Sequence, residues 1–259
     1  MGEGRTTEHG LFVARGGSGD RLLVLLHGLG ANSSVWRRMI PLIEESWNGR
    51  WIAPDLRGHG RSGREGPYGY GTHAADIASL IDREQSSDVM IVGHSMGGVV
   101  AAVVATGWFG PRVREVAAFG VKIDWTADEV GKAQDMAQRP ARAFATCDEA
   151  IDRYLKVSGL IGLVDPTSPE ACFGVVGSEG QYLVALDPRV YGAVGPPIEP
   201  LLRLAGAPLR LAAGSKDPMV TLEQMRRVDP AAQLFDGAGH NAHWEAPEQV
   251  WSFVVGSSQ

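Results

Sequence analysis

Residues 88–98 have the sequence Asp-Val-Met-Ile-Val-Gly-His-Ser-Met-Gly-Gly, and this stretch decides the fold. The apolar run at Val89–Val92 predicts a buried strand, and the small residues of 96–106 predict a helix that packs closely on a sheet. Ser95 lies at the turn between them, with a glycine two positions before it and another two positions after it. Those glycines let strand and helix approach each other around a strained serine. The turn would expose the Ser95 hydroxyl beside a helix N-terminus, where backbone N–H groups favour a developing oxyanion.

The Gly-x-Ser-x-Gly string is weak evidence by itself. A chain with 34 glycines among 259 residues produces about 0.3 such strings by chance. Its place between a strand and a helix is the stronger observation, because a nucleophile elbow needs that context. We therefore predict that Ser95 is a nucleophile.

The segments around this turn alternate between short apolar runs and helical periodicity. Such alternation is typical of a mainly parallel sheet with crossover helices. The predicted strands are 22–27, 51–54, 88–92, 116–123, 208–213 and 233–235. The predicted helices are 33–46 with Ser33 or Ser34 as N-cap, 72–83, 96–106 and 247–255.

The pattern changes after Asp124. Two Thr-x-x-Glu capping boxes, at 126–129 and 146–149, begin helices with no strand predicted between them. We therefore predict an inserted helical cap at 125–200, and a core made of 1–124 and 201–259. The cap is rich in aromatic residues, which favours a mostly apolar small substrate.

Composition excludes several classes of protein. A formal net charge of −6 argues against a nucleic-acid partner, which calls for clustered Lys and Arg. The sequence has neither a secretory apolar run nor a stretch long enough to span a membrane, so we expect a soluble cytoplasmic protein with no membrane partner. Cys147 and Cys172 lack metal-site spacing. We expect no metal, no cofactor and a small-molecule substrate as partner; the oligomeric state is not predicted.

Further motifs follow strands in a consistent order. They are Leu26-His27-Gly28-Leu29-Gly30, Pro54-Asp55-Leu56-Arg57-Gly58-His59-Gly60-Arg61-Ser62, Gly214-Ser215-Lys216-Asp217 and Gly237-Ala238-Gly239-His240. With the Ser95 motif they place nucleophile, acid and base in that chain order. Over nearly its whole length the chain resembles the α/β-hydrolase superfamily, specifically its capped serine esterases and lactonase-like members. The resemblance implies an α/β fold with a mostly parallel eight-stranded sheet flanked by helices.

A serine hydroxyl needs a base, and a neutral imidazole suits that task. Among seven histidines we favour His240, because it follows the last predicted strand and a flexible glycine turn. His243 lies farther along the same loop and is the alternative base; its expected role is a pocket wall or a support behind the catalytic groups. The other five are expected elsewhere: His9 and His73 in exposed polar contexts, His27 and His59 in loop packing, and His94 pointing away from Ser95.

The base needs a carboxylate that holds its tautomer. Asp217 follows a predicted strand and precedes a proline, so the chain turns away and leaves the carboxylate at the strand end. Asp124, at the end of the preceding strand, is the alternative, since some members of the superfamily carry their acid there. The Gly-Ser-Lys-Asp setting favours Asp217.

The resemblance also implies an oxyanion hole formed by the backbone N–H groups of Leu29 and Met96. Glycines at 28 and 30 would let that loop approach closely. The residues expected in the substrate pocket are His27, Gly28, His94, Trp125 and His243.

A serine at the elbow argues against dehalogenases and epoxide hydrolases, which resemble this chain but use an aspartate there. We predict a hydrolase that cleaves an ester or lactone of a small, mostly apolar molecule through an acyl-enzyme on Ser95. The same triad also serves thioesterases, carbon–carbon bond hydrolases and cofactor-free perhydrolases. A non-catalytic ligand receptor on the same fold is a further alternative.

Overall fold

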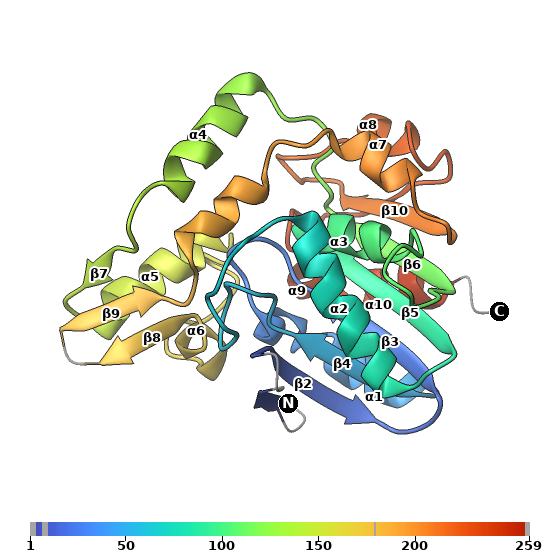
Figure 1. Ribbon diagram of the computed structural model, residues 1–259, viewed down its shortest axis with the longest axis horizontal. Coiled ribbons are helices and arrows are strands. Elements are labelled where there is room, and N and C mark those ends of the chain that lie inside the picture. The colour runs from blue at the N-terminus through green and yellow to red at the C-terminus, as the bar shows by residue number, and fades with distance from the viewer. Residues whose placement is uncertain (1–3, 7–9, 179, 257–259) are drawn as a thin grey trace.

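The computed structural model describes residues 4–6, 10–178 and 180–256, and contains an eight-stranded sheet covered by helices on both faces (Figure 1). The strand order is β1-β2-β4-β3-β5-β6-β10-β11. The two pairs that involve β2 are antiparallel. The other pairs of this sheet, which join β4, β3, β5, β6, β10 and β11 in that order, are parallel. This is the mostly parallel α/β sheet predicted from the sequence.

The elements of this core lie on both sides of a long insertion. Its strands are β1 (Gly4–Thr6), β2 (Phe12–Gly17), β3 (Arg21–Leu26), β4 (Arg50–Pro54), β5 (Asp88–His94), β6 (Glu115–Phe119), β10 (Leu209–Gly214) and β11 (Gln233–Phe235). Its helices are η1 (Ser33–Trp36), α1 (Ile40–Ser46), α2 (Tyr70–Glu84), α3 (Met96–Val104), α7 (Ile198–Arg203), α8 (Leu222–Arg226), α9 (Ala242–Glu245) and α10 (Pro247–Val255).

The central strands are apolar on both sides because helices cover both faces of the sheet. In β3, Leu22, Val24 and Leu26 pack with α2, α3 and α7. The alternate residues Leu23 and Leu25 pack with η1, α1 and α10. A strand buried on both faces has a continuous apolar run, which is why the sequence predicted it well.

Strand register determines where the functional loops meet. Leu26 pairs with Gly93, and His94 pairs with Phe119. The parallel strands β3, β5 and β6 therefore end at the same edge of the sheet. The residues that follow them, including Gly28 and Ser95, lie at this carboxyl edge.

Residues 125–200 form more than the predicted helices. Helices α4 (Ala127–Ala137), α5 (Cys147–Val157), α6 (Pro169–Cys172) and η2 (Pro188–Ala193) are joined by a three-stranded antiparallel sheet of β7 (Ala143–Phe144), β9 (Gln181–Val184) and β8 (Val175–Ser178). Both predicted capping boxes are present. The expectation of no strand between them is wrong, because β7 is too short to give a periodic signal. In Figure 1 this insertion occupies the side of the molecule away from β10. The domain boundaries stay a prediction.

Other local predictions are also corrected. The helix expected at 33–46 is two pieces, η1 and α1, with Pro41 in the first turn of α1. Asn32, rather than Ser33 or Ser34, caps η1. His73 is fully buried although its sequence context suggested exposure. It lies on the inner face of α2, whose polar neighbours hid that position. His9 lies outside the described residues.

Among the described residues, the helices are all too short or too polar to cross a membrane.

Candidate active site

Ser95 lies at a strained turn between β5 and α3. Its backbone has φ +52° and ψ −118°, a region that side-chain-bearing residues rarely adopt. A Cβ on Gly93 would lie 2.5 Å from the Gly97 carbonyl oxygen, and one on Gly97 would lie 2.2 Å from that of Leu26. Only glycines fit at both positions. The strain is therefore held by tight packing of strand against helix, and it directs Ser95 into a pocket at the sheet edge.

His240 and Asp217 form a pair beside Ser95. His240 Nδ1 lies 2.8 Å from Asp217 Oδ2, and the Asp217 side chain is fully buried. The second carboxylate oxygen accepts the backbone N–H of Met219 at 2.8 Å. A carboxylate accepts but does not donate, so Nδ1 carries the proton and Nε2 is left free for a pocket group.

Asp124 takes no part in this pair. Its side chain is 51% exposed, and it accepts hydrogen bonds from Arg227 and Gln224. The Arg227 guanidinium holds the pKa of Asp124 below its usual value. The structure thus places Asp217, and not Asp124, against His240.

His94 fixes the loop that carries His240. Its Nε2–H donates to the His240 backbone carbonyl at 2.9 Å, and its ring lies 4.7 Å from the His240 ring. Burial holds the pKa of His94 well below the usual value, so the ring is neutral. The sequence predicted that His94 points away from Ser95. In the structure His94 supports His240 and also lines the pocket.

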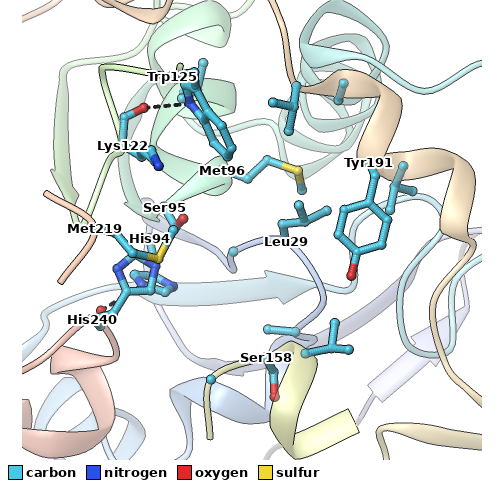
Figure 2. A pocket seen from close by; sticks show the side chains of 18 of the residues that line it. Leu29, His94, Ser95, Met96, Lys122, Trp125, Ser158, Tyr191, Met219 and His240 are labelled. Carbon is cyan, nitrogen blue, oxygen red and sulfur yellow. Dashed lines mark hydrogen bonds between the residues drawn. The ribbon is translucent and has the colours of Figure 1, made fainter. Parts of the chain in front are cut away.

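The pocket has a volume of about 280 Å³ and is lined by both the core and the insertion. Figure 2 shows Ser95, His240 and Met219 on one side of it, with Leu29 and Tyr191 opposite. Most of the lining is apolar, including Val99, Val157, Val190 and Val194. Such a pocket suits an apolar group held next to a few polar atoms.

The predicted pocket residues divide into two groups. Gly28, His94 and Trp125 do line the pocket. His27 and His243 do not, because both are fully buried behind it. His27 accepts the Leu56 N–H and donates to the Gly28 carbonyl. It therefore supports the loop after β3 from the side away from the pocket. His243 packs among the rings of Trp36, His94 and Phe119. Loop histidines could not be sorted into wall and support from their order in the sequence.

Leu29 and Met96 lie at the pocket, as the oxyanion prediction requires. Met96 is the first residue of α3, and a helix leaves its first N–H groups without an intrahelical acceptor. A Cβ on Gly28 would lie 2.9 Å from the His94 ring and 3.1 Å from Ser95 Cβ. Glycine at 28 therefore lets the loop approach Ser95 closely. The oxyanion hole of the Leu29 and Met96 N–H groups stays a prediction that this placement allows.

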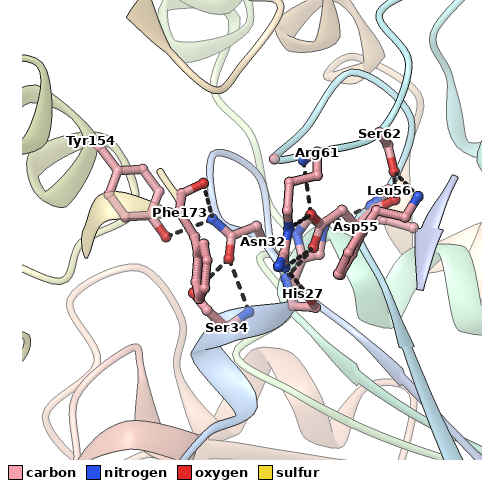
Figure 3. Close-up of polar contacts among 12 residues, drawn as sticks. His27, Asn32, Ser34, Asp55, Leu56, Arg61, Ser62, Tyr154 and Phe173 are labelled. Carbon is pink, nitrogen blue, oxygen red and sulfur yellow. Dashed lines mark hydrogen bonds and ion pairs between the residues drawn. The ribbon is translucent and has the colours of Figure 1, made fainter. Parts of the chain in front are cut away.

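A buried polar network supports the loop after β3, and only some of its members were predicted from sequence motifs (Figure 3). Asp55 is fully buried and accepts the N–H groups of Ser33 and Arg61 at 2.7 and 2.9 Å. The Arg61 guanidinium also pairs with Asp55 at 3.0 Å and donates to Ser33 Oγ. The 54–62 motif contained Asp55 and Arg61, but their link to the loop after β3 appears only in three dimensions.

Asn32 joins the core to the insertion. Its side-chain amide donates to the Tyr154 hydroxyl at 3.1 Å and to the Phe173 carbonyl at 3.2 Å. Its carbonyl oxygen accepts the Ser34 N–H at 2.9 Å. One buried side chain thus fixes α5 and the end of α6 over the loop that borders the pocket.

Within the described part of the chain, no group of three or more His, Cys, Asp or Glu side chains could hold a metal ion. The arrangement as it stands can activate a serine hydroxyl, hold the imidazole that takes its proton, and bind a negative oxygen through backbone N–H groups.

Comparison with known proteins shows which family the chain matches. The model of the Alpha/beta hydrolase family matches residues 23–253. Lipase LipV of Mycobacterium tuberculosis is 30% identical over 70% of this chain, which spans 65% of the lipase. The magnesium-chelatase 30 kDa subunit of Rhodobacter capsulatus is 29% identical over 90% of this chain and 85% of its own length. The human protein phosphatase methylesterase 1 is 25% identical, and the chain spans only 49% of it.

Solved structures share the fold at low sequence identity. The thioesterase domain from the curacin biosynthetic pathway has a TM-score of 0.77 and 21% identity, with 98% of this chain and 99% of that domain covered. E-2-(Acetamidomethylene)succinate hydrolase also has a TM-score of 0.77, with 22% identity and 98% of each chain covered. An N-acyl homoserine lactonase has a TM-score of 0.71 and 18% identity, with 99% of this chain and 95% of that chain covered.

Proposed function

The chain belongs to the Alpha/beta hydrolase family, and on that premise we propose that it is a serine hydrolase that cleaves an ester or lactone of a small molecule. One observation carries the proposal: Ser95 on its strained turn shares a largely apolar pocket with His240, whose other nitrogen is held by the buried Asp217.

Acylation begins with attack of Ser95 Oγ on the carbonyl carbon of the substrate. His240 Nε2 takes the hydroxyl proton, and Asp217 stabilises the imidazolium through the Nδ1–H bond. The carbonyl oxygen becomes negative and accepts the N–H groups of Leu29 and Met96. When the tetrahedral intermediate collapses, His240 returns the proton to the leaving alcohol, and the acyl group remains on Ser95.

Deacylation reverses these roles with water as the nucleophile. His240 takes a proton from water, the hydroxide attacks the acyl carbonyl, and the same N–H groups bind the oxygen. Ser95 Oγ leaves with the proton from His240, and the carboxylic acid is released. In a lactone the leaving alcohol stays attached to the acyl group, so the product is a single hydroxy acid.

The pocket supports an apolar substrate of modest size. Its volume of about 280 Å³ suits a short acyl chain, and the insertion supplies Val157, Val190 and Val194 as apolar walls. Relatives named as lipase and methylesterase, and a structural neighbour that is a lactonase, agree with carboxylic ester chemistry.

The test is turnover together with covalent labelling. Purified protein should hydrolyse short-chain acyl nitrophenyl esters or lactones, and a fluorophosphonate should label Ser95. Ser95→Ala should abolish labelling and reduce kcat by about 10⁶-fold. A protein that neither turns over any ester or lactone nor reacts with fluorophosphonate would be a ligand receptor, and the proposal would fail.

A carbon–carbon hydrolase, a thioesterase and a perhydrolase use the same groups, so the substrate panel should include a vinylogous 1,5-diketone, acyl thioesters and peroxide with a short acid. A kcat/KM higher for one of these than for every ester would reassign the reaction while keeping Ser95 as nucleophile.

A further inference from the structure

A second hollow of about 400 Å³ lies in the insertion next to the pocket of Ser95. Its walls come from the end of α4, the segment before β7, α5 and the segment from β9 to η2. Val157 and Tyr191 line both hollows and form the boundary between them. The two hollows therefore lie on either side of these two residues.

Three arginines line this second hollow, and its lining contains no acidic residue. They are Arg139, Arg142 and Arg153. Within the described ranges none of them forms an ion pair with a carboxylate, whereas the neighbouring Arg189 is paired with Asp187. Arg142 lies over the Phe144 ring at 4.9 Å, which orients its guanidinium beside the hollow. Three positive charges around one space attract an anion.

Positive charge also continues from this hollow toward Ser95. Lys156 lines the pocket of Ser95 and follows Arg153 by three residues on α5, so the two lie on neighbouring positions of one helix face. Across the boundary, the charge of Arg153 opposes the rise in the Tyr191 pKa that burial causes. The two hollows thus share one wall, which Val157 and Tyr191 form.

We propose that this arginine hollow binds an anionic group of the substrate, a carboxylate or a phosphate, while the ester of the same molecule lies at Ser95. Guanidinium groups bind both anions through paired N–H donors. This inference rests on the proposed hydrolase function and adds a substrate class to it: an acyl compound with an apolar middle and a charged end.

The first experimental arm tests a carboxylate on the acyl chain. Nitrophenyl esters of ω-carboxyalkanoic acids are compared with esters of the monoacids that carry a methyl group in place of the carboxylate, over a series of chain lengths. We expect the carboxylate to raise kcat/KM at one chain length. Replacing Arg139, Arg142 and Arg153 together by Gln should remove that advantage, about tenfold, and leave the neutral esters unchanged.

The second arm tests a phosphate on the leaving group. Hexanoyl-coenzyme A is compared with hexanoyl-N-acetylcysteamine, which has the same thioester but no phosphate. A preference for the coenzyme A ester that disappears in the triple Gln variant assigns the hollow to phosphate, whereas a preference only in the first arm assigns it to carboxylate. Equal loss with charged and neutral substrates, or hydrolysis of neutral esters with no charge preference in either arm, would overturn the inference.

Matched variants separate charge from other effects. Replacing the same three arginines by Lys keeps the positive charge and should retain part of the preference. Arg112→Gln removes an exposed arginine near the amino end of β6, at the opposite edge of the sheet, and should change neither substrate class.

Binding keeps the inference testable without turnover. In calorimetry the free ω-carboxy acids and coenzyme A are titrated into Ser95→Ala protein, with and without the triple Gln substitution. Binding that is lost with the arginines supports the anionic site even if no ester is cleaved, an outcome that rejects only the proposed hydrolase. Hydrolysis of neutral esters with no anion binding and no charge preference rejects only this inference.

Discussion

The carboxyl edge of the sheet and the insertion that faces it differ in how their charges are held. At the sheet edge, Asp55 and Asp217 are fully buried, and both of their carboxylate oxygens accept hydrogen bonds. In the insertion, Arg139, Arg153 and Lys156 are exposed around open hollows.

This difference separates two tasks. Chemistry needs groups whose positions are fixed before the substrate arrives, and buried, fully bonded carboxylates provide that. Recognition of a substrate tail needs side chains that extend to the ligand and positions where substitutions are tolerated. Exposed side chains on a peripheral segment provide both. We therefore expect substitutions at the sheet edge to affect kcat or folding strongly, and substitutions in the insertion to affect substrate preference or local stability.

The largest contrast is expected between two aspartates. Asp217→Asn should reduce kcat by about 10⁴-fold, because the amide favours the wrong tautomer of His240. Asp124→Asn removes an exposed partner of Arg227 at the start of the insertion and should leave kcat unchanged. Steady-state kinetics of both variants on one ester measure this. A greater loss of kcat in Asp124→Asn than in Asp217→Asn would identify Asp124 as the acid.

A second contrast concerns stability. Asp55→Asn replaces one carboxylate oxygen by an NH2 group, which then faces the N–H group of Ser33 or of Arg61, and it removes the charge that pairs with Arg61. It should lower the free energy of unfolding by about 3 kcal/mol. Asp187→Asn in the insertion weakens a bridge to the exposed Arg189, and should cost about 1 kcal/mol. Urea denaturation of both variants measures the difference. Equal losses would show that the insertion is as tightly coupled to global folding as the sheet edge.

Acid should destabilise the core before the insertion, because residues 125–200 contain no histidine. Burial lowers the pKa of His243 to about 3 and that of His73 to about 4. Both groups titrate near pH 6.5 when unfolded, so the unfolded state binds more protons below that pH. The free energy of unfolding should therefore fall as pH drops from 6.5 toward 4, by about 1.4 kcal/mol per pH unit for each histidine.

The variant His243→Phe tests this, because it keeps a ring against Trp36 and Phe119 without a group that titrates. The slope of unfolding free energy against pH should decrease by the contribution of one histidine. An unchanged slope between pH 6.5 and 4 would mean that His243 accepts a proton in the folded protein.

The smallest effects are expected at the two capping boxes of the insertion. Thr146→Ala should lower the free energy of unfolding by about 1 kcal/mol, because α5 buries Ile151, Tyr154 and Leu155. Thr126→Ala should cost less, since α4 buries only Ala133 and can fray without global unfolding. Denaturation curves together with hydrogen exchange of the two helices measure this, and an equal global loss would contradict it.

Apolar periodicity predicted the central core well and the insertion less well. Strands β3 to β6 are buried on both faces, so their sequences are short continuous apolar runs, which are typical of buried strands. Strands β7, β8 and β9 have two to four residues, and Phe144 of β7 is the one buried residue among them, which leaves no pattern to detect. The apolar periodicity predicted one helix where the structure has η1 and α1, because both helices present apolar residues to the same face of the sheet.

The Ser95 turn follows from local sequence, because glycines two residues away on either side are needed wherever a strand and helix meet so closely. Local sequence also favoured Asp217 and His240, whose motifs follow strand ends. Which side chains face the pocket depends on tertiary packing. His27, His94 and His243 all lie near the carboxyl edge, yet only His94 lines the pocket, because that depends on how loops from four strands pack together. The grouping of Arg139, Arg142 and Arg153 also depends on tertiary packing. Separate helices and turns bring the three arginines to one hollow, and the spacing of these residues in the sequence does not predict it.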